Sequence, residues 1–178
     1  MSSIPAEKFA SALNSCLPDD ISIVSSSEAD EEFHPRFSAK IKHYRYVIIN
    51  RPYKSAIWAK KAWHVREKLD FIAMERAAED FIGSHCFKAF CASGNNVKTY
   101  ERNIHLAKWH KDGDFLFFDI RGDGFLYNMV RIMVGTMVDI GKGRFDPEII
   151  PKALALGQRN LVGITAPPDG LYLMEVFY

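Results

Sequence analysis

The stretch GFLYNMVRIMVGTMVDIGKG, residues 124–143, decides the expected fold because it reads as one buried helix. Between Met129 and Ile140 the strongly polar residues are Arg131, Thr136 and Asp139, so no single wet face emerges. A helix that is apolar nearly all round is typical of a protein core. A guanidinium at the centre of such a helix keeps its charge, and burying it unpaired costs several kcal/mol. Arg131 therefore needs a carboxylate or phosphate partner.

The chain itself offers three acids as partners for Arg131. Asp119 and Asp123 precede it, and Glu175 lies near the C-terminal end. Asp123 belongs to RGDG, a glycine-flanked turn in which aspartate is favoured for its own hydrogen bonding. The residues alone leave two possibilities for the partner of Arg131. It forms a structural ion pair with one of these acids, or its partner comes from elsewhere.

The composition is that of a globular protein large enough to bury a core. The chain has 178 residues, 48% of them hydrophobic and 25% charged. No apolar run approaches the roughly 20 residues of a membrane span, and no leader sequence is seen, so we expect a cytoplasmic protein. Three cysteines without zinc-ribbon spacing suit a reducing compartment. A metal site at His85, Cys86 and Cys91 is conceivable but lacks paired ligand motifs, so no metal is expected.

Charge is distributed unevenly along the chain. Residues 1–35 are mostly acidic, whereas residues 36–68 hold ten Lys or Arg residues against the single acid Glu67. Tyrosines and tryptophans are interleaved with these bases, a pattern that fits phosphates held by charge and bases held by stacking. The alternative is a solvated sheet edge guarded by lysines.

Periodicity and turn residues predict mixed secondary structure without a repeating βαβ rhythm, hence an α+β fold with a largely antiparallel sheet. Asp70 is expected to cap a helix that ends at Gly83, and Gly157 to end another. The expected helices span residues 5–13, 71–82, 124–143 and 147–156. The expected strands span residues 21–27, 40–50, 99–109, 115–121 and 170–178. In the strand at 40–50, alternation places Lys40, Lys42, Tyr44, Tyr46 and Ile48 on one face and Ile41, His43, Arg45, Val47 and Ile49 on the other.

Four blocks of sequence resemble the tRNA pseudouridine synthases of the TruA family, in the family's order. FHPRFSAKIKHYRYVI (33–48) is similar to FHARFSAxxRxYRY, and GSHCFKAFCASG (83–94) to GxHDFxxFxxxG. The helix at 124–143 resembles GFLYxMVRxxVGxLxxVGxG, and APPDGLYLMEVFY (166–178) resembles APxxGLxLxxVxY. The resemblance implies a mixed, largely antiparallel sheet with helices packed on one face. It also implies that residues 1–24 are a remnant of the segment linking to an N-terminal domain, and that 25–178 form the C-terminal domain.

The resemblance assigns roles to individual residues. Tyr44 corresponds to the tyrosine that stacks on the target base and is tied to the chemistry, although a half-buried strand tyrosine is the plainer interpretation. Arg131 corresponds to the basic residue that pairs with the catalytic aspartate and keeps it ionised. Residues expected to contact the substrate, some of which could equally be plain core, are Arg36, Tyr44, Phe125, Leu126, Leu171 and Leu173. Residues expected to bind RNA are Lys40, Lys42 and Arg45.

The family's catalytic aspartate belongs to a GRTDxGVHA motif, which does not occur in these 178 residues. The resemblance therefore predicts that this chain alone is inactive. Arg131 should then face a water-filled or ion-bearing pocket, or borrow a neighbour such as Asp123.

The activity implied by the resemblance is isomerisation of uridine to pseudouridine in the anticodon stem-loop of tRNA, by a homodimer without metal or organic cofactor. The target base has to leave the stack to be reached, which explains an aromatic platform beside a basic surface. The alternative is a non-catalytic RNA-binding or dimerisation module on the same scaffold.

Overall fold

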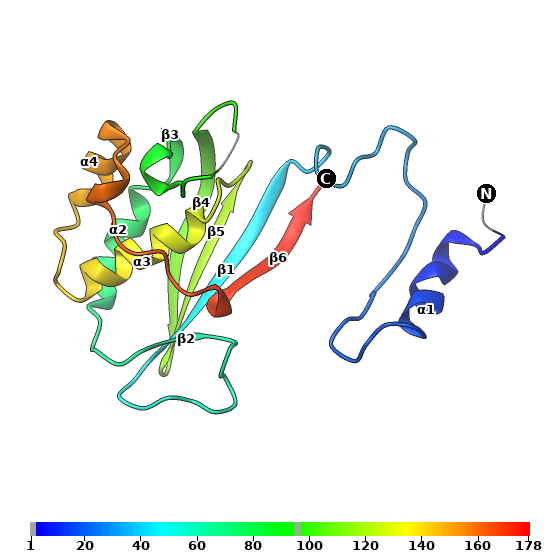
Figure 1. Cartoon of the computed structure of the whole chain (residues 1–178), viewed down its shortest axis with the longest axis horizontal. Coiled ribbons are helices and arrows are strands. Elements are labelled where there is room, and N and C mark those ends of the chain that lie inside the picture. The colour runs from blue at the N-terminus through cyan, green and yellow to red at the C-terminus, as the bar shows by residue number, and fades with distance from the viewer. Residues whose placement is uncertain (1–2, 95–96) are drawn as a thin grey trace. The chain divides into compact units, whose positions relative to one another are not determined.

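The computed structural model describes residues 3–94 and 97–178, and the chain forms two compact units, residues 1–38 and 39–178. The first unit contains a 3-10 turn η1 (Ala6–Lys8) followed by helix α1 (Phe9–Asn14), which confirms the predicted helix at 5–13 (Figure 1). The strand predicted at 21–27 is wrong. The Asn14 side chain bonds both the N–H and the C=O of Ile23 at 2.8 Å, so a side chain takes the place of a neighbouring strand.

The second unit is built on a sheet with six strands among the described residues. The order is β2-β1-β5-β4-β3, and β6 also pairs with β1. The β1–β2 pair is parallel and the remaining pairs are antiparallel, which confirms the predicted α+β fold with a largely antiparallel mixed sheet. The strands are β1 (Ile41–Asn50), β2 (Trp63–Val65), β3 (Gly83–Cys86), β4 (Glu101–Asp112), β5 (Phe115–Gly122) and β6 (Leu171–Phe177).

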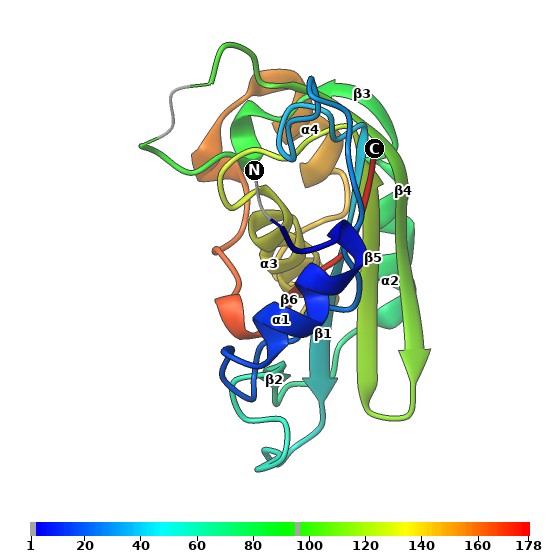
Figure 2. The same cartoon turned by 90° about the vertical axis from the view of Figure 1, so that its right-hand side faces the viewer.

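Three helices cover the same side of this sheet: α2 (Phe71–Glu79), α3 (Met129–Gly141) and α4 (Ile149–Leu156). Figure 1 shows them together beside the strands, and Figure 2, turned by 90°, shows β1, β5 and β4 running side by side. The prediction of helices on one face is thereby confirmed. The largest fully buried side chains are Trp109, Tyr46, Phe81, Phe87, Phe90 and Phe118.

The helix ends follow the predicted capping with one correction. Asp70 Oδ1 accepts a hydrogen bond from the Ala73 N–H at 3.0 Å, and Gly157 ends α4 with a φ of 64°. Gly83 does not end α2, which stops at Glu79. With a φ of 102°, Gly83 begins β3 instead, because glycine allows the chain to reverse there without steric cost.

Helix α3 is the buried helix that the sequence predicts, since every one of its residues except Arg131 is buried. It begins later than expected, because Asn128 adopts a left-handed φ of 58° immediately before Met129. Arg131 therefore lies in the first turn, and the prediction that it sits at the helix centre is wrong.

The middle of α3 is shaped to receive the chain segment 163–166. A Cβ atom on Gly135 would lie 1.9 Å from the carbonyl oxygen of Ile164, so this close approach requires glycine. Thr136 Oγ1 accepts a hydrogen bond from the Gly163 N–H at 3.0 Å and donates to the Ile132 carbonyl at 2.8 Å. These contacts hold the last two residues of this segment, Thr165 and Ala166, against the start of α3.

Candidate functional site

A cavity of about 150 Å³ lies where β1, β6 and the start of α3 meet. Tyr44 comes from the middle of β1, where it pairs with Ile120 of β5 and Leu173 of β6. Antiparallel pairing on both sides fixes the backbone of Tyr44. The residues that line the cavity are Tyr44, Phe125, Leu126, Asn128, Met129, Val130, Arg131 and Leu171.

Arg131 is fixed in this cavity by neutral partners. Its Nε donates to the Ala166 carbonyl oxygen at 2.7 Å, and its Nη1 donates to Asn128 Oδ1 at 2.9 Å. The Ala166 N–H in turn donates to the Arg131 carbonyl oxygen at 3.0 Å. None of the ion pairs among the described residues includes Arg131. Its position is thus set without any acid that neutralises its charge.

The three acids of the chain that could have paired with Arg131 are engaged elsewhere or lie apart from it. Asp119 is bound by Arg45 and His43, with an Arg45 Nη2–Oδ2 distance of 2.9 Å and a His43 Nε2–Oδ1 distance of 2.7 Å. Asp123 accepts from the Asn103 N–H at 3.1 Å. Glu175 lies opposite His43 in the β1–β6 register.

The electrostatics of the cavity favour an anion. Arg131 is partly buried and sits in the first turn of a helix whose N-terminus carries partial positive charge. The helix dipole does not stabilise a cation at this end of the helix. The guanidinium and the helix N-terminus are both positive, so both attract an anion that enters the cavity. A carboxylate or phosphate oxygen is the ligand that both would stabilise.

Tyr44 presents a flat ring beside this charge. The ring is partly buried and meets Phe125 edge-on, with centroids 5.2 Å apart. Burial raises the pKa of the Tyr44 hydroxyl, so Tyr44 is neutral near pH 7. Tyr46, the next residue on this face, is fully buried and donates its hydroxyl to the Pro167 carbonyl at 2.6 Å, so Tyr46 is a core residue.

The structure brings five of the predicted site residues to one cavity and leaves the others outside it. Leu173 is 53% exposed and does not line the cavity. Arg36 belongs to the first unit, where its guanidinium lies 5.8 Å from the ring centroid of Phe37. Lys40 is exposed and Lys42 is partly buried. The residues in the cavity are Tyr44, Phe125, Leu126, Arg131 and Leu171.

Arg45 points to the face of β1 opposite Tyr44, as the alternation predicts. Its guanidinium binds both carboxylate oxygens of Asp119 and lies 5.4 Å from the ring centroid of Phe117. Burial opposes ionisation of Asp119, but hydrogen bonds from Arg45 and His43 outweigh it, so the pKa of this carboxyl is lower than usual. Arg45 thus forms a part-buried ion pair on the far side of the strand.

Two groups of the site were not predicted from the sequence. Asn128 sets the start of α3 and binds Arg131, and an asparagine directly before an apolar helix is a signal that could have identified it. The Ala166 carbonyl leaves no such signal, because any residue supplies a carbonyl and only the fold brings this one to Arg131.

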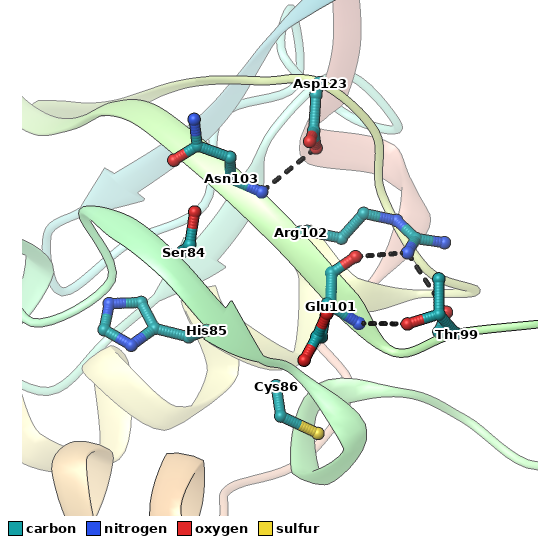
Figure 3. A pocket seen from close by; sticks show the side chains of 8 residues that line it. All are labelled: Ser84, His85, Cys86, Thr99, Glu101, Arg102, Asn103 and Asp123. Atoms are coloured by element: carbon teal, nitrogen blue, oxygen red, sulfur yellow. Dashed lines mark hydrogen bonds between the residues drawn. The ribbon is translucent and has the colours of Figure 1, made fainter.

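A larger cavity of about 440 Å³ lies at the β3–β4 edge of the sheet (Figure 3). Its polar groups bind the local backbone: Asp123 accepts from the Asn103 N–H, and Thr99 Oγ1 accepts from the Glu101 N–H at 3.1 Å. In the described parts of the chain, no group of three His, Cys, Asp or Glu residues is placed to hold a metal ion. Within the same residues, no helix is long and apolar enough to cross a membrane.

Comparison with known proteins gives a consistent result. The profile of a family described as tRNA pseudouridine synthase matches residues 77–178, which include α3 and the cavity residues from Phe125 to Leu171. A tRNA pseudouridine synthase A of Acetivibrio thermocellus is 47% identical over 177 residues, covering 99% of this chain and 72% of the relative. Those of Moorella thermoacetica and Geotalea uraniireducens are 47% and 45% identical over 175 residues, covering 98% of this chain and 71% and 72% of the relatives.

Proposed function

The chain belongs to the tRNA pseudouridine synthase family, and we propose that the cavity at Tyr44 and Arg131 receives a uridine of the tRNA anticodon stem-loop for isomerisation to pseudouridine. In that reaction the bond from ribose C1′ to uracil N1 breaks and a bond from C1′ to C5 forms. The proton on C5 is lost and N1 gains one, so no oxidant or other co-reactant is consumed. The substrate has to be flipped out of its stack to reach such a cavity.

Tyr44 is the base platform in this proposal. Its ring forms part of the cavity wall and is held by Phe125 and by strand pairing on both sides. Stacking of a base on an aromatic side chain contributes about 1–3 kcal/mol. Phe125, Leu126 and Leu171 complete an apolar wall that keeps water from the reacting base.

Arg131 is the positioning group for the catalytic aspartate of the GRTDxGVHA motif, which these 178 residues do not contain. The single observation that supports this role is a guanidinium fixed by Asn128 and Ala166 in the Tyr44 cavity, with no acid of the described residues paired to it. An aspartate arriving there would be held ionised and aimed at the ribose. The chain alone is accordingly inactive.

The remaining functional features complete the proposal. In the second unit, Lys40 and Lys42 contact tRNA on the Tyr44 face of β1, and Arg45 does so on the opposite face. Arg36 of the first unit is a separate tRNA contact, and Leu173 contributes to the cavity rim once tRNA is bound. The active form is a cytoplasmic homodimer that needs neither a metal nor an organic cofactor.

A chimaera tests this function directly. These 178 residues replace the matching 72% of the Acetivibrio thermocellus relative, whose remaining part stays in place. Release of tritium from tRNA labelled at uridine C5 is expected from the chimaera, and its loss when Arg131 is changed to Met. Arg76→Met, an exposed position on α2, is the matched control and should leave the rate unchanged. A chimaera whose Arg131→Met variant turns over at the parent rate would refute the role of Arg131.

A further inference from the structure

A second cavity, of about 440 Å³, lies between η2 (Lys88–Phe90), the segment that follows it, and η3 (Arg159–Leu161). Its polar lining differs from that of the cavity in Figure 3, which contains Glu101 and Asp123. No acidic residue is among the described residues that line this one. The side chains that give it its character are Lys88, Ser93, Tyr100, Arg159 and Thr165.

Arg159 is the fixed cation of this cavity. Its Nη1 donates to the carbonyl oxygens of Val162 at 3.3 Å and Gly163 at 2.9 Å, and its Nη2 lies 3.4 Å from Thr165 Oγ1. Those bonds use three of the five N–H donors of a guanidinium. Burial lowers the pKa of Arg159, and no ion pair among the described residues includes it. The charge is thus partly desolvated and has donors to spare.

Lys88 supplies a second, exposed cation. Its Nζ lies 6.0 Å from the ring centroid of Tyr100. The hydroxyls of Ser93 and Thr165 add donors that carry no charge. The two cations and the hydroxyls of Ser93 and Thr165 form a donor set that suits the oxygens of a phosphate, and no acid among the described lining residues would repel it.

The cavity adjoins the Tyr44–Arg131 site through two stretches of backbone. Thr165 of this cavity is followed directly by Ala166, whose carbonyl oxygen binds Arg131 Nε, and consecutive Cα atoms are about 3.8 Å apart. On the other side, the Ala92 N–H donates to the Tyr127 carbonyl at 3.0 Å, next to Asn128 of the Tyr44 cavity. Neighbouring residues of the same backbone stretches therefore border the two cavities.

We propose that the cavity lined by Lys88, Ser93, Arg159 and Thr165 binds a backbone phosphate of the tRNA strand next to the flipped uridine. This inference rests on the proposed function, because it takes the base in the Tyr44 cavity as its starting point. The phosphate contact holds the strand in register, while Tyr44 and Arg131 act on the base and on the aspartate.

The test is binding of unmodified tRNA to the 178-residue chain at several salt concentrations. Lys88→Gln removes one cation at an exposed position and should weaken binding about 3- to 10-fold near 0.1 M salt. It should also lower the slope of log Kd against log salt by about 0.7 to 0.9, the value of one phosphate contact. Lys152→Gln, exposed on α4 and outside this cavity, is the matched control and should change neither quantity.

Arg159 is tested without relying on a variant that could unfold. Arg159→Lys keeps a charge but loses the planar guanidinium that binds the carbonyls of Val162 and Gly163 and the Thr165 hydroxyl. The circular dichroism melt of this variant is therefore recorded beside its tRNA affinity. A folded Arg159→Lys chain should bind tRNA more weakly than the parent, with the deficit shrinking at high salt. If that variant does not fold, Lys88→Gln decides the matter.

Inorganic phosphate and uridine monophosphate separate a strand contact from a site for free phosphates. We expect millimolar phosphate to leave the melting temperature of the chain unchanged, while Lys88→Gln weakens tRNA binding. An unchanged affinity and salt slope in Lys88→Gln would overturn the inference. Saturable stabilisation by free phosphate below 1 mM, lost in Lys88→Gln, would also overturn it in favour of a small-ligand site. Turnover by the chimaera is a separate readout, so failure here is distinguishable from failure of the proposed function.

Discussion

Arg131 shows how one charge constrains the rest of a site. A guanidinium remains protonated when buried, so its surroundings must supply either an acid or access to one. Here the surroundings supply the Ala166 carbonyl oxygen and the Asn128 amide oxygen, which orient the guanidinium without neutralising its charge. In the proposed function, this charge is available to an anion that arrives with another part of the protein or with the substrate.

Arg131 substitutions should separate charge from geometry in the chimaera. Arg131→Lys keeps the charge but cannot bind Asn128, Ala166 and a carboxylate together, so turnover should fall about 10-fold or more. Arg131→Met should lower kcat by about 100-fold or more, the range seen when one preorganised electrostatic donor is removed. Steady-state tritium release measures both, and equal rates for Lys, Met and parent would contradict the assignment.

Tyr44 substitutions should separate stacking from the hydroxyl. Tyr44→Phe retains the ring, so the affinity of the chimaera for tRNA should stay within about twofold of the parent. Tyr44→Leu removes the platform, whose stacking contributes about 1–3 kcal/mol, and should weaken substrate capture by roughly 5- to 150-fold. Substrate capture is measured as kcat/KM for tRNA in the parent, Tyr44→Phe and Tyr44→Leu chimaeras. Identical values for Leu and Tyr would mean that Tyr44 is only a strand residue.

At the residue scale, the sequence identifies five residues that line one cavity, but not the groups that hold them in place. Arg131 is recognisable in the sequence because it is a permanent cation within an apolar stretch, and Tyr44 is recognisable because it belongs to the YRY motif. The backbone oxygen of Ala166 cannot be predicted, because it reaches Arg131 only after Gly135 and Thr136 have received the segment before it. Leu173, the last residue of the GLYL segment, is 53% exposed and lies at the register shift of β6 opposite His43 and Tyr44, which no periodic pattern indicates.

At the element scale, α3 is the framework on which both cavities depend. Its Gly135 admits the 163–166 segment, which carries Ala166 to Arg131 and Thr165 to Arg159. A change in this helix–loop contact should therefore affect both sites at once.

Gly135→Ala tests that dependence. Alanine favours a helix over glycine by about 1 kcal/mol. The new Cβ would nevertheless stand 1.9 Å from the Ile164 oxygen, and overpacking of this kind costs about 1–3 kcal/mol or more. Because the close atom belongs to the backbone, we expect the upper end of that cost, so urea unfolding should show a net loss of about 2 kcal/mol in the free energy of unfolding. Gly124→Ala is the control, because its Cβ would meet the flexible Arg102 side chain at 3.3 Å; equal stabilities of the two variants would contradict the argument.

The Asp119 cluster on the opposite face of β1 makes a pH-dependent contribution. Because the folded pKa of Asp119 is lowered, its stabilisation is present above the unfolded value of about 3.9 and is lost as the pH falls through the folded value. Asp119→Asn should therefore cost about 2 kcal/mol at pH 7, with the gap to the parent closing at acidic pH. Urea titrations at pH 7 and pH 3 measure both gaps.

Asp114→Asn is the matched control for that prediction. Asp114 is half exposed and lies 3.4 Å from Arg51, so its substitution should change stability by less than about 0.5 kcal/mol. A gap for Asp119→Asn that is as small as this, or one that widens toward acid, would contradict the account of the cluster.

Element boundaries were predictable where local signals agree. The signals for the strand β1, the Asp70 cap and the Gly157 end all act over a few residues, and these three features were predicted correctly. The strands β2 and β3 have only three and four residues, too few for a periodic pattern to register. Residues around Ile23 have high β-propensity but form no strand, because the side chain of Asn14 binds the Ile23 backbone N–H and C=O. Asn14 lies nine residues earlier, so no local pattern indicates this contact.

At the scale of the whole molecule, the proposed function gives the chain an incomplete set of catalytic groups. The cavity contains Tyr44 and Arg131, the proposed base platform and cation, whereas the proposed acid belongs to a motif that these 178 residues lack. Binding and turnover should therefore separate: tRNA should bind to the chain and remain unmodified.

Binding of tRNA to the chain should depend steeply on salt, because the proposed contacts are mostly to phosphates. If about five phosphates are contacted, affinity should fall roughly 100-fold between 50 mM and 200 mM salt. Filter binding across that range measures the slope. Salt-insensitive binding, or none, would mean that the basic residues of 36–68 form only a solvated surface.

The central claim is that Arg131 awaits a carboxylate supplied from outside these residues. It is tested most directly by tritium release from tRNA labelled at uridine C5, measured for the 178-residue chain beside the chimaera that adds the remaining part of the Acetivibrio thermocellus relative. The chain should release no tritium above background and the chimaera should release it steadily. Steady release by the chain alone would contradict the claim, because an acid among these residues would then have to perform the chemistry.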